Sequence, residues 1–502
     1  VVAWKGERAS AQIVLWTAQG ADGVKCEVKE FKSADATLPA TIAETHFVRY
    51  TIADERFQVK KGTTLQPDML DTLPTFDMAA QTVRPVWLTI AVPQDAKEGI
   101  YKSEVVVSYN GTGKVKLPLT LEVQKHTLAT PDKWSYHLDL WQHPTSVART
   151  YGVELWSDAH FEALKPIMKR LADAGQKVIT CTLNRDPWRY QCFDDYEAMI
   201  HWYRYDNEWK YDYTIFDKWV EFMMELGINK QINCYSMLPW RTIVDYQDMR
   251  TTSKDNRLRQ IKATPGTPEF EEAWGPFLVD FSAHLREKGW LNITNIAIDE
   301  RAPEDMDEAA RLIKKYAPEL GFAMADNHDS YKRYTNMRDV CVGQRHSLML
   351  PEEIAMRRAN GDVSTFYVCC STLFPNCFTN SQPYESELLC VYGIAHDYDG
   401  MLRWAYNSWA EDPQYDSRFG NWMSGDTYLV YPYNRSSMRF ERLIDGIEVT
   451  EKIRALRAAG VDMSGVDAVL EKIRSLEITD YNLPWQQVVK EAQAALDEAA
   501  RK

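Results

Sequence analysis

Two adjacent carboxylates, Asp299 and Glu300, close a short apolar stretch of the sequence. Ile293, Ile296 and Ile298 give this stretch the β-branched character of a buried strand. In parallel α/β proteins, ligands bind at the carboxyl ends of strands, where this pair is expected to lie. Burial and mutual repulsion hold neighbouring carboxyls in different protonation states. The pair therefore has the equipment for acid and base chemistry on a glycosidic bond.

The same dipeptide has a purely structural alternative. An Asp that caps the following helix, beside a surface Glu that pairs with Arg301, would place the same two residues at this point. The elements around the pair decide between the two interpretations.

The organisation of the chain predicts a multidomain protein. Short alternating or apolar runs separated by turn signals indicate a β-sandwich over residues 1–126. Strand-like runs alternating with amphipathic helices predict a (β/α)8 TIM-type barrel over residues 134–435. Amphipathic stretches over 436–502 predict a C-terminal helical extension that packs on the barrel.

The expected barrel has eight strands, at residues 136–141, 177–183, 230–237, 293–300, 321–326, 339–342, 363–370 and 400–404. Asp299 and Glu300 then end the fourth strand. A doubly wound open sheet shows the same alternation of strand and helix, but no glycine-rich phosphate loop follows the first strand.

Composition narrows the class of partner. The net charge of −14, with no basic tract to offset it, argues against nucleic acid. No run of 18 apolar residues occurs, so no membrane span is predicted. The 17 Trp and 26 Tyr suit a carbohydrate, whose C–H faces stack on aromatic rings, although a large core also uses these residues.

Cysteine and histidine spacing predicts neither a metal nor a cofactor. The nine cysteines show no C-x-x-C spacing, and histidines do not cluster as zinc ligands do. The disulfide status and the oligomeric state are left open. The chain starts on a strand-like segment rather than on a signal peptide, as an exported protein with a trimmed leader also would.

The seventh strand is informative for what it lacks. A retaining glycosidase with an enzyme nucleophile needs a second carboxylate about 5–5.5 Å from the acid, and in many barrels it ends this strand. Here no Asp or Glu occurs between Asp362 and Glu385. The gap favours a 2-acetamido sugar whose own acetamide oxygen is the nucleophile. Asp299 would then orient the acetamide N–H, and Glu300 would act as general acid and then as general base.

The Ile-Asp-Glu ending at 298–300 resembles glycoside hydrolase family 123, the β-N-acetylgalactosaminidases. Further similar blocks lie at 4–16, 98–101, 404–409, 425–432 and 437–448. The resemblance implies a sandwich joined to a (β/α)8 barrel. It also implies retaining, exo-acting release of terminal β-linked N-acetylgalactosamine from glycans or glycolipids through an oxazoline-type intermediate. Export to the periplasm, the cell surface or the medium is expected from the bacterial members.

Two other functions stay open at this point. A β-N-acetylglucosaminidase would have the same machinery, because one or two loop residues read the 4-hydroxyl. A non-catalytic carbohydrate-binding protein of the same superfamily would keep the fold without turnover.

Further candidate sugar-binding residues lie at predicted strand ends. A ring could stack, and hydroxyls could find partners, at the end of the eighth strand, on Trp404, Tyr406, Asn407 and Trp409. Tyr367 on the seventh strand is a candidate hydroxyl donor to the acetamide oxygen, with core packing as the alternative.

The remaining candidates are divided among four places in the chain. The fifth strand ends on three residues that could bind a sugar hydroxyl or position the acid: Asp326, Asn327 and His328. The first and second strands contribute candidate pocket-lining groups: His137, Asp139, Trp141, Asp186 and Trp188. After the eighth strand, Asp412 and Asp416 bind the sugar or cap turns.

Overall fold

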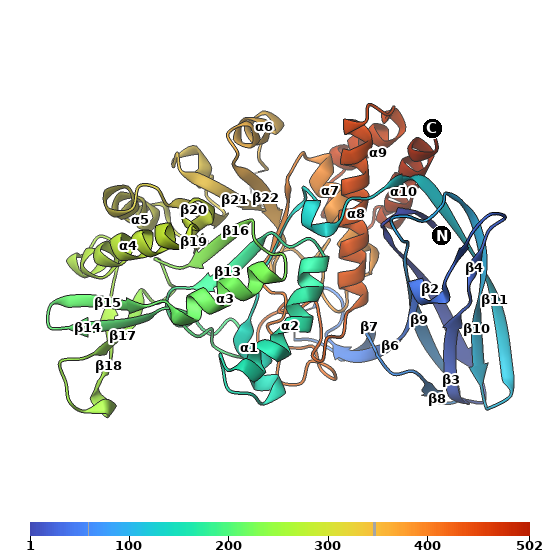
Figure 1. Ribbon diagram of the computed structural model, residues 1–502, viewed down its shortest axis with the longest axis horizontal. Coiled ribbons are helices and arrows are strands. Elements are labelled where there is room, and N and C mark those ends of the chain that lie inside the picture. Colours follow the sequence, from blue (N-terminus) through green and yellow to red (C-terminus); the bar gives the residue numbers. More distant parts are fainter. Residues whose placement is uncertain (59, 345–347) are drawn as a thin grey trace. The chain divides into compact units, whose positions relative to one another are not determined.

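The computed structural model describes residues 1–58, 60–344 and 348–502, and it divides into two compact units (Figure 1). Unit 1 comprises Val1–Tyr136, Cys370–His396 and Asp412–Lys502. Unit 2 comprises His137–Cys369 and Asp397–Glu411. The domain boundaries that the sequence suggested stay a prediction.

Unit 1 contains the predicted β-sandwich. One sheet has the order β1-β11-β10-β3-β8, with β4 and β5 added at β10, and the other has the order β2-β9-β6-β7. The strands are β1 Val2–Lys5, β2 Arg8–Thr17, β3 Ala21–Val28, β4 Phe31–Lys32, β5 Thr37–Leu38, β6 Ala43–Ala53, β7 Thr64–Leu70, β8 Phe76–Met78, β9 Thr82–Ala91, β10 Gly99–Tyr109 and β11 Gly113–Thr127.

A hairpin forms the long edge of the first sheet. β10 and β11 pair antiparallel from Gly99–Val123 to Tyr109–Gly113, and the turn between them contains Asn110 and Gly111 at positive φ. These two residue types adopt that backbone region at low cost, which is why the turn forms here. The core between the two sheets includes buried side chains from both, such as Ile90 and Leu121.

The helices of unit 1 are α7 Tyr384–Ala395, α8 Met438–Ala458, α9 Ser464–Ser475 and α10 Trp485–Arg501. Helix α8 begins at Ser437, whose hydroxyl accepts the N–H of Phe440 at 3.1 Å, as an N-cap does. α8 contacts β2 and β7 of the sandwich, and α10 contacts β11. The predicted C-terminal helices are present, and their packing on the barrel stays a prediction.

Buried ion pairs fix α8 within unit 1. The Arg439 guanidinium donates to both carboxylate oxygens of Asp68 at 2.9–3.0 Å, and Lys452 donates to Glu7 at 2.8 Å. Both pairs are buried. Removing one partner would leave an uncompensated charge in the interior, a change that costs about 3–5 kcal/mol.

Unit 2 contains the predicted barrel of eight parallel strands. Their order around the sheet is β12-β23-β22-β21-β20-β19-β16-β13. The strands are β12 His137–Leu140, β13 Val178–Thr182, β16 Gln231–Tyr235, β19 Thr294–Asp299, β20 Gly321–Asp326, β21 Met337–Gly343, β22 Val363–Tyr367 and β23 Gly400–Arg403. All eight overlap the strands expected from the sequence.

The barrel is nearly closed, and two glutamines complete its seam. Between β12 and β13 there is a single bridge, from Leu138 to Gln176. The Gln176 amide spans the seam, accepting the N–H of Leu140 at 3.0 Å and donating to the Val178 carbonyl at 2.8 Å. Gln142 accepts the N–H of Thr180 at 2.9 Å in the same seam. These bonds satisfy backbone groups at the two strand edges, and they exclude an open doubly wound sheet.

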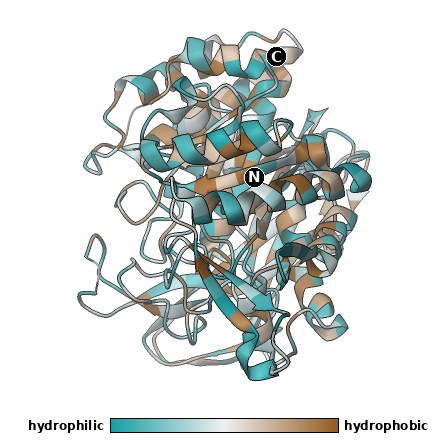
Figure 2. Cartoon of the chain, turned by 90° about the vertical axis from the view of Figure 1, so that its left-hand side faces the viewer, coloured by the Kyte–Doolittle hydropathy of each residue, from teal (hydrophilic) through white to brown (hydrophobic). Residues whose placement is uncertain are grey.

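Helices connect most of the barrel strands. In unit 2 they are α1 Pro144–Tyr151, α2 Asp158–Asp173, α3 Thr214–Glu225, α4 Pro268–Lys288, α5 Pro303–Tyr316 and α6 Pro351–Ala359. The connection from β20 to β21 has a 3₁₀ turn, Ser330–Lys332, where a helix was expected. Hydrophilic and hydrophobic stretches alternate along the helices in Figure 2, as amphipathic packing requires. No helix of the described ranges has both the length and the apolar character that a membrane crossing requires.

A second sheet interrupts the barrel and was not predicted. It has the order β15-β14-β17-β18 and is built from two excursions, one after β13 and one after β16. Its strands are β14 His201–Tyr205, β15 Glu208–Asp212, β17 Ile243–Asp248 and β18 Leu258–Lys262. Both excursions leave from the carboxyl ends of barrel strands, the end at which ligands bind in this architecture.

Candidate active site

Asp299 and Glu300 lie at the carboxyl end of β19, the fourth barrel strand, as predicted. Asp299 pairs with Ala325 of β20, and the Glu300 N–H donates to the Ala325 carbonyl at 2.9 Å. Glu300 has a φ of 42°, the left-handed region that residues other than glycine rarely adopt. Both side chains are half-buried. Positive φ at a non-glycine residue is typical of functional sites that the surrounding fold holds in place.

The electrostatics of Asp299 suit proton chemistry near neutral pH. Burial, and then the Glu300 carboxylate, raise the pKa of Asp299 to about 7, while Arg301 and Trp240 oppose that rise. A carboxyl with such a pKa exchanges its proton close to physiological pH. The helix-capping alternative is not supported, because the N-cap residue of α5 is Ala302, without a side-chain cap.

Tyr367 faces the carboxylate pair from across the barrel. It ends β22, the seventh strand, and its hydroxyl donates to Oε1 of Glu300. Burial and then Glu300 raise the pKa of Tyr367 well above its usual range, which keeps this group a neutral O–H donor. The place where many retaining glycosidases carry a nucleophilic carboxylate thus holds a phenol.

An aromatic cluster occupies the barrel interior beside these groups. Trp141 lies 4.8 Å from Trp188 and 4.6 Å from Tyr235 between ring centroids, and Trp188 lies 4.7 Å from Tyr196. Tyr367 belongs to the same buried cluster. The half-buried Trp404 packs against it. Trp141, Trp188 and Trp404 were expected to line a pocket, and the structure brings them together near the acid pair.

Sequence reasoning missed Trp240, which follows β16 and adjoins Asp299. Its side chain is 42% exposed, and the Arg301 guanidinium covers its ring at 4.4 Å from the centroid. Arg301 also donates to the Leu238 carbonyl at 2.9 Å. The sequence contained a signal for this residue, because Trp240 lies five residues beyond the end of β16. Aromatic residues were considered as sugar contacts only at the ends of other strands.

Three residues that follow β23 were predicted to bind sugar, but the structure gives them a supporting position. Tyr406, Asn407 and Trp409 are fully buried. The Asn407 amide accepts the N–H of His143 at 2.9 Å and donates to its carbonyl at 3.0 Å, while the Tyr406 hydroxyl donates to the Ile167 carbonyl at 3.0 Å. These bonds tie the segment after β23 to His143, which precedes α1, and to helix α2, so we assign these residues to the framework rather than to sugar contact.

The residues that end β20 are divided between a turn and the surface. The Asp326 carboxylate accepts the N–H groups of His328 and Ser330, at 2.9 and 2.5 Å, and also the Ser330 hydroxyl. Asp326 therefore stabilises its own turn. His328 is exposed, and Asn327 is half-buried. The roles in sugar binding suggested for Asp326 and His328 have no support from these contacts.

His137 lies at the other end of the barrel from where a sugar-binding role requires it. It is the first residue of β12, and its Nε2 lies 3.6 Å from Oδ2 of Asp339, a buried residue near the start of β21. Gln231, the first residue of β16, donates to the same oxygen at 2.6 Å. Asp139, two residues further along β12 and near Trp141, is also buried. The strand-end argument failed for His137 because it was applied to the wrong end of a short strand.

Three other acidic candidates occupy distinct places. Asp186 follows β13 and accepts the N–H of Tyr190 at 2.9 Å. Asp412 and Asp416 belong to unit 1. There the Asp416 carboxylate is paired with Arg418 at 2.6 Å, which supports the turn-capping alternative for Asp416.

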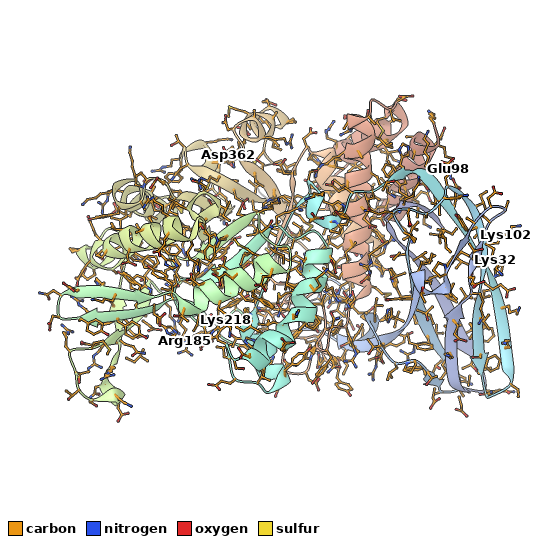
Figure 3. All side chains as sticks on the ribbon, viewed as in Figure 1. Lys32, Glu98, Lys102, Arg185, Lys218 and Asp362 are labelled. Atoms are coloured by element: carbon orange, nitrogen blue, oxygen red, sulfur yellow. The ribbon has the colours of Figure 1, made fainter. Side chains whose placement is uncertain are left out.

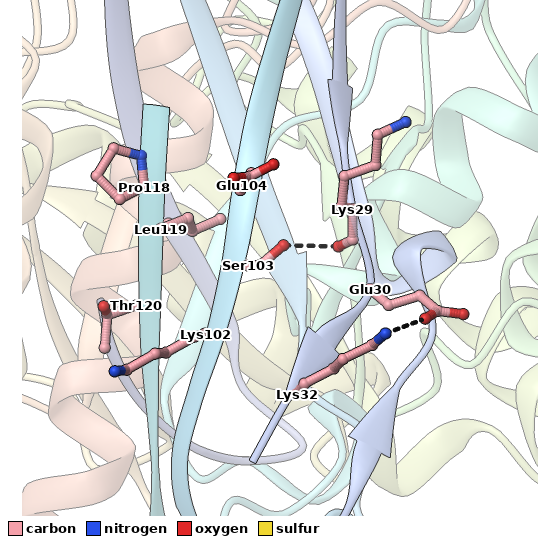
Figure 4. Close-up of a pocket in the computed structure, with 9 residues that line it drawn as sticks. All are labelled: Lys29, Glu30, Lys32, Lys102, Ser103, Glu104, Pro118, Leu119 and Thr120. Carbon is pink, nitrogen blue, oxygen red and sulfur yellow. Dashed lines mark hydrogen bonds and ion pairs between the residues drawn. The ribbon is translucent and has the colours of Figure 1, made fainter. Parts of the chain in front are cut away.

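Other features of the described chain do not form a site of this kind. The cysteines of the described ranges form no disulfide bonds. Within the described ranges, no three His, Cys, Asp or Glu side chains converge as metal ligands. An open hollow of about 760 Å³ lies over β10 and β11 of the sandwich, where Lys32 pairs with Glu30 at 3.3 Å (Figure 4). Its charged residues lie on the exposed surface, so it has no desolvated acid like Asp299.

The sequence and the fold were compared with known proteins. The catalytic-domain model of glycoside hydrolase family 123 matches residues 141–456, and the N-terminal-domain model of the same family matches residues 1–109. No curated protein matches the chain.

Among solved structures, the chain is similar to a family 123 glycoside hydrolase from Clostridium perfringens that was analysed for glycolipid glycan hydrolysis. That match has a TM-score of 0.91 and 24% identity, and it covers 100% of this chain and 93% of that one. A family 5 xyloglucanase from Bacteroides ovatus matches with a TM-score of 0.33 and 8% identity, over 89% of this chain and 98% of that one. The second similarity is too low to carry an argument. The two family models together with the shared fold place this chain in glycoside hydrolase family 123.

Proposed function

We propose that the protein is a retaining, exo-acting β-N-acetylgalactosaminidase that uses the acetamide group of its substrate as the nucleophile. The observation that carries the proposal is the contact between Tyr367 and Glu300. A phenol stands at the end of the seventh strand, and the sequence holds no carboxylate between Asp362 and Glu385. Substrate-assisted glycosidases do not need that second carboxylate.

In the first step, the acetamide carbonyl oxygen attacks the anomeric carbon and the glycosidic C–O bond breaks. Glu300 gives its proton to the leaving oxygen. Asp299 accepts the hydrogen bond of the acetamide N–H and stabilises the positive charge that develops on the group. The product of this step is an oxazoline-type intermediate and a free aglycone.

Substrate binding supplies the proton where it is needed. Burial and the neighbouring Glu300 raise the pKa of Asp299 to about 7, so Asp299 can hold a proton close to neutral pH. The acetamide N–H favours the ionised form of Asp299. The proton that Asp299 releases as the sugar binds can pass to Glu300, which then acts as the acid.

In the second step, water attacks the anomeric carbon from the face that the aglycone left. The Glu300 carboxylate takes the proton of that water, the bond from the acetamide oxygen to the anomeric carbon breaks, and Glu300 is protonated again. Two inversions at one carbon retain its configuration.

Tyr367 supports this reaction as a donor rather than as a nucleophile. A tyrosine beside a glutamate serves as the nucleophile in sialidases. Here burial and Glu300 raise the pKa of Tyr367, so its phenolate is disfavoured. The hydroxyl instead orients Glu300 and lies near enough to the pair to reach an acetamide oxygen.

The first experiment is hydrolysis of three p-nitrophenyl glycosides: β-GalNAc, β-GlcNAc and β-galactose. We expect turnover of the β-GalNAc glycoside and no turnover of the β-galactoside. NMR of the reaction should show the β-anomer of the released sugar first, as retention of configuration requires. Comparable turnover of the β-galactoside would contradict the substrate-assisted route. Preference for β-GlcNAc would keep the mechanism and change the sugar.

Variants separate an enzyme from a binding protein. Glu300→Gln is expected to lower turnover of the β-GalNAc glycoside by about 100- to 10,000-fold, since it removes the general acid. The matched control is Glu221→Gln on α3, whose carboxylate pairs with Lys288 at 2.6 Å on the surface. Sugar binding without product release, in the wild type and in Glu300→Gln alike, would show a binding protein.

A further inference from the structure

We propose that a polar hollow beside Trp240 is a subsite for one neutral sugar of the leaving group. This inference rests on the proposed function and deepens it, because it concerns what the released GalNAc was attached to. The hollow has a volume of about 170 Å³, and all of its lining residues belong to unit 2. Because a cavity needs only about 10–15 Å³ of this volume to hold one water molecule, the hollow has room for a small ligand such as one sugar ring.

Two loops and the inserted sheet form the walls. The loop after β13 contributes Arg185, which Figure 3 labels, and Tyr190. The loop after β16 contributes Arg241, and the inserted sheet contributes Asp245 and Gln260. These two loops follow the second and third barrel strands, and the third, β16, pairs directly with the strand that ends on the acid pair.

Trp240 connects the hollow to the reacting groups. Its neighbours in the chain, Pro239 and Arg241, line the hollow, while its own side chain adjoins Asp299. The backbone N–H of Trp240 donates to the Pro187 carbonyl at 2.9 Å and so joins the two loops. Arg301 lies 4.4 Å from the centroid of the indole ring, and 42% of Trp240 is exposed, so part of its surface is accessible to a ligand. A sugar attached to the scissile oxygen would meet this ring first.

The lining selects a neutral sugar rather than an anion or a lipid chain. Three carboxylates and two guanidinium groups line the hollow: Asp186, Asp195, Asp245, Arg185 and Arg241. An anionic ligand would meet the excess of negative charge, and an acyl chain would desolvate polar groups without pairing them. Sugar hydroxyls both donate and accept, so they match a wall of donors and acceptors.

The planar groups of the wall are already oriented. Arg241 lies 4.5 Å from the centroid of the Tyr190 ring and donates to its hydroxyl, and Gln260 donates to Asp245 at 2.7 Å. Tyr190 is 63% exposed, which leaves ring surface for stacking.

Backbone strain is concentrated in the same walls. Asp186, Arg189, Tyr190 and Thr242 all have φ between 43° and 58°. This conformation is unfavourable for residues other than glycine, and residues that adopt it are common in ligand-binding loops.

The test compares two substrates in one pair of variants. The substrates are p-nitrophenyl β-GalNAc, whose leaving group has no hydroxyls, and a disaccharide in which β-GalNAc is linked to galactose. For Arg241→Ala we expect the ratio of kcat/KM on the disaccharide to kcat/KM on the aryl glycoside to fall at least fivefold. The matched control, Arg259→Ala, removes an exposed arginine from the neighbouring position of β18 and should leave this ratio at the wild-type value.

An unchanged ratio in Arg241→Ala would overturn the subsite, and so would an equal fall in Arg259→Ala. If the wild type cleaves neither substrate, the proposed function fails and the hollow is tested by itself. Binding of the same disaccharide is then measured by NMR in the wild type and in Arg241→Ala. Weaker binding in the variant supports the subsite, whereas equal binding or none overturns it.

Discussion

Two aspartates of one barrel have a pKa near neutrality, and they differ in what surrounds them. Burial raises the pKa of Asp299 to about 7 with help from Glu300, and burial raises the pKa of Asp139 to about 7 with help from Asp339. Asp299 is half-buried at a carboxyl strand end, beside the exposed Trp240. Asp139 is 1% exposed, within a short strand whose first residue is His137.

The comparison shows that a shifted pKa marks desolvation before it marks function. Beside Asp139, Asp339 has a lowered pKa and His137 a raised one, although burial opposes both shifts, because the two groups stabilise each other's charge. The two Asp139 carboxylate oxygens are themselves buried. At the end of β19 the neighbours of Asp299 include a half-buried glutamate and an exposed indole, so a substrate can complete the set.

The largest effect is expected when the two aspartates are neutralised in turn. Asp299→Asn should lower kcat on the β-GalNAc glycoside by about 100- to 1,000-fold, the loss typical of one group that stabilises transition-state charge. Asp139→Asn should leave kcat within about threefold of the wild type, because its carboxyl does not reach a substrate. Steady-state kinetics of the two purified variants measures both effects. Comparable losses in the two would mean that pKa, and not access, decides which aspartate is used.

The next effect concerns the hydrogen bond from the Tyr367 hydroxyl to the Glu300 carboxylate. Tyr367→Phe removes a hydrogen bond to a carboxylate, a bond worth about 1.5–3 kcal/mol, so kcat/KM should fall about 10- to 100-fold. Tyr406→Phe is the control, since its hydroxyl bonds a backbone carbonyl within the framework. It should lower the melting temperature and leave kcat in place. A loss in Tyr367→Phe as deep as that in Glu300→Gln would instead indicate a tyrosine nucleophile.

Much of this architecture was predictable, and the failures have physical causes. The eight barrel strands were found because buried parallel strands are apolar runs with helices between them. The position of Asp299 and Glu300 at a strand end was predicted from the β-branched run before them, while their catalytic role stays a prediction. Tyr406 and Asn407 were misassigned, since a buried framework contact and a sugar contact need the same residue types. The inserted sheet and Trp240 were missed because short, aromatic strands in long loops carry weak periodicity.

A third effect appears in stability rather than in activity. The folded pKa of Asp139, about 7, exceeds the unfolded value of about 3.9. Between these two pH values the folded state binds more protons than the unfolded state, so the contribution of Asp139 to stability falls as pH rises. His137 and Asp339 face this group and are present in both proteins compared. Asp139→Asn should therefore gain stability relative to the wild type from pH 5 to pH 8, by on the order of 1–3 kcal/mol.

Denaturant unfolding of the wild type and Asp139→Asn at several pH values measures that difference. A difference that stays constant from pH 5 to pH 8 would show that Asp139 keeps an ordinary pKa in the folded protein. The same series on Asp299→Asn should show a pH dependence of the same sign and similar size, because the pKa of Asp299 is also about 7.

The smallest effect concerns the backbone conformation of Glu300, apart from the charge of its side chain. Glu300 has a φ of 42°, whereas Asp139 lies within a regular strand. Asparagine adopts the left-handed region more readily than glutamine or glutamate does. Glu300→Asn and Glu300→Gln both remove the repulsion with Asp299. Made in a Tyr367→Phe background, which removes the hydroxyl that bonds residue 300, the two variants differ chiefly in the backbone. We expect Glu300→Asn to be the more stable by about 1 kcal/mol, with both variants inactive. Equal melting temperatures would mean that the surrounding strands, and not residue 300, set the energy of this turn.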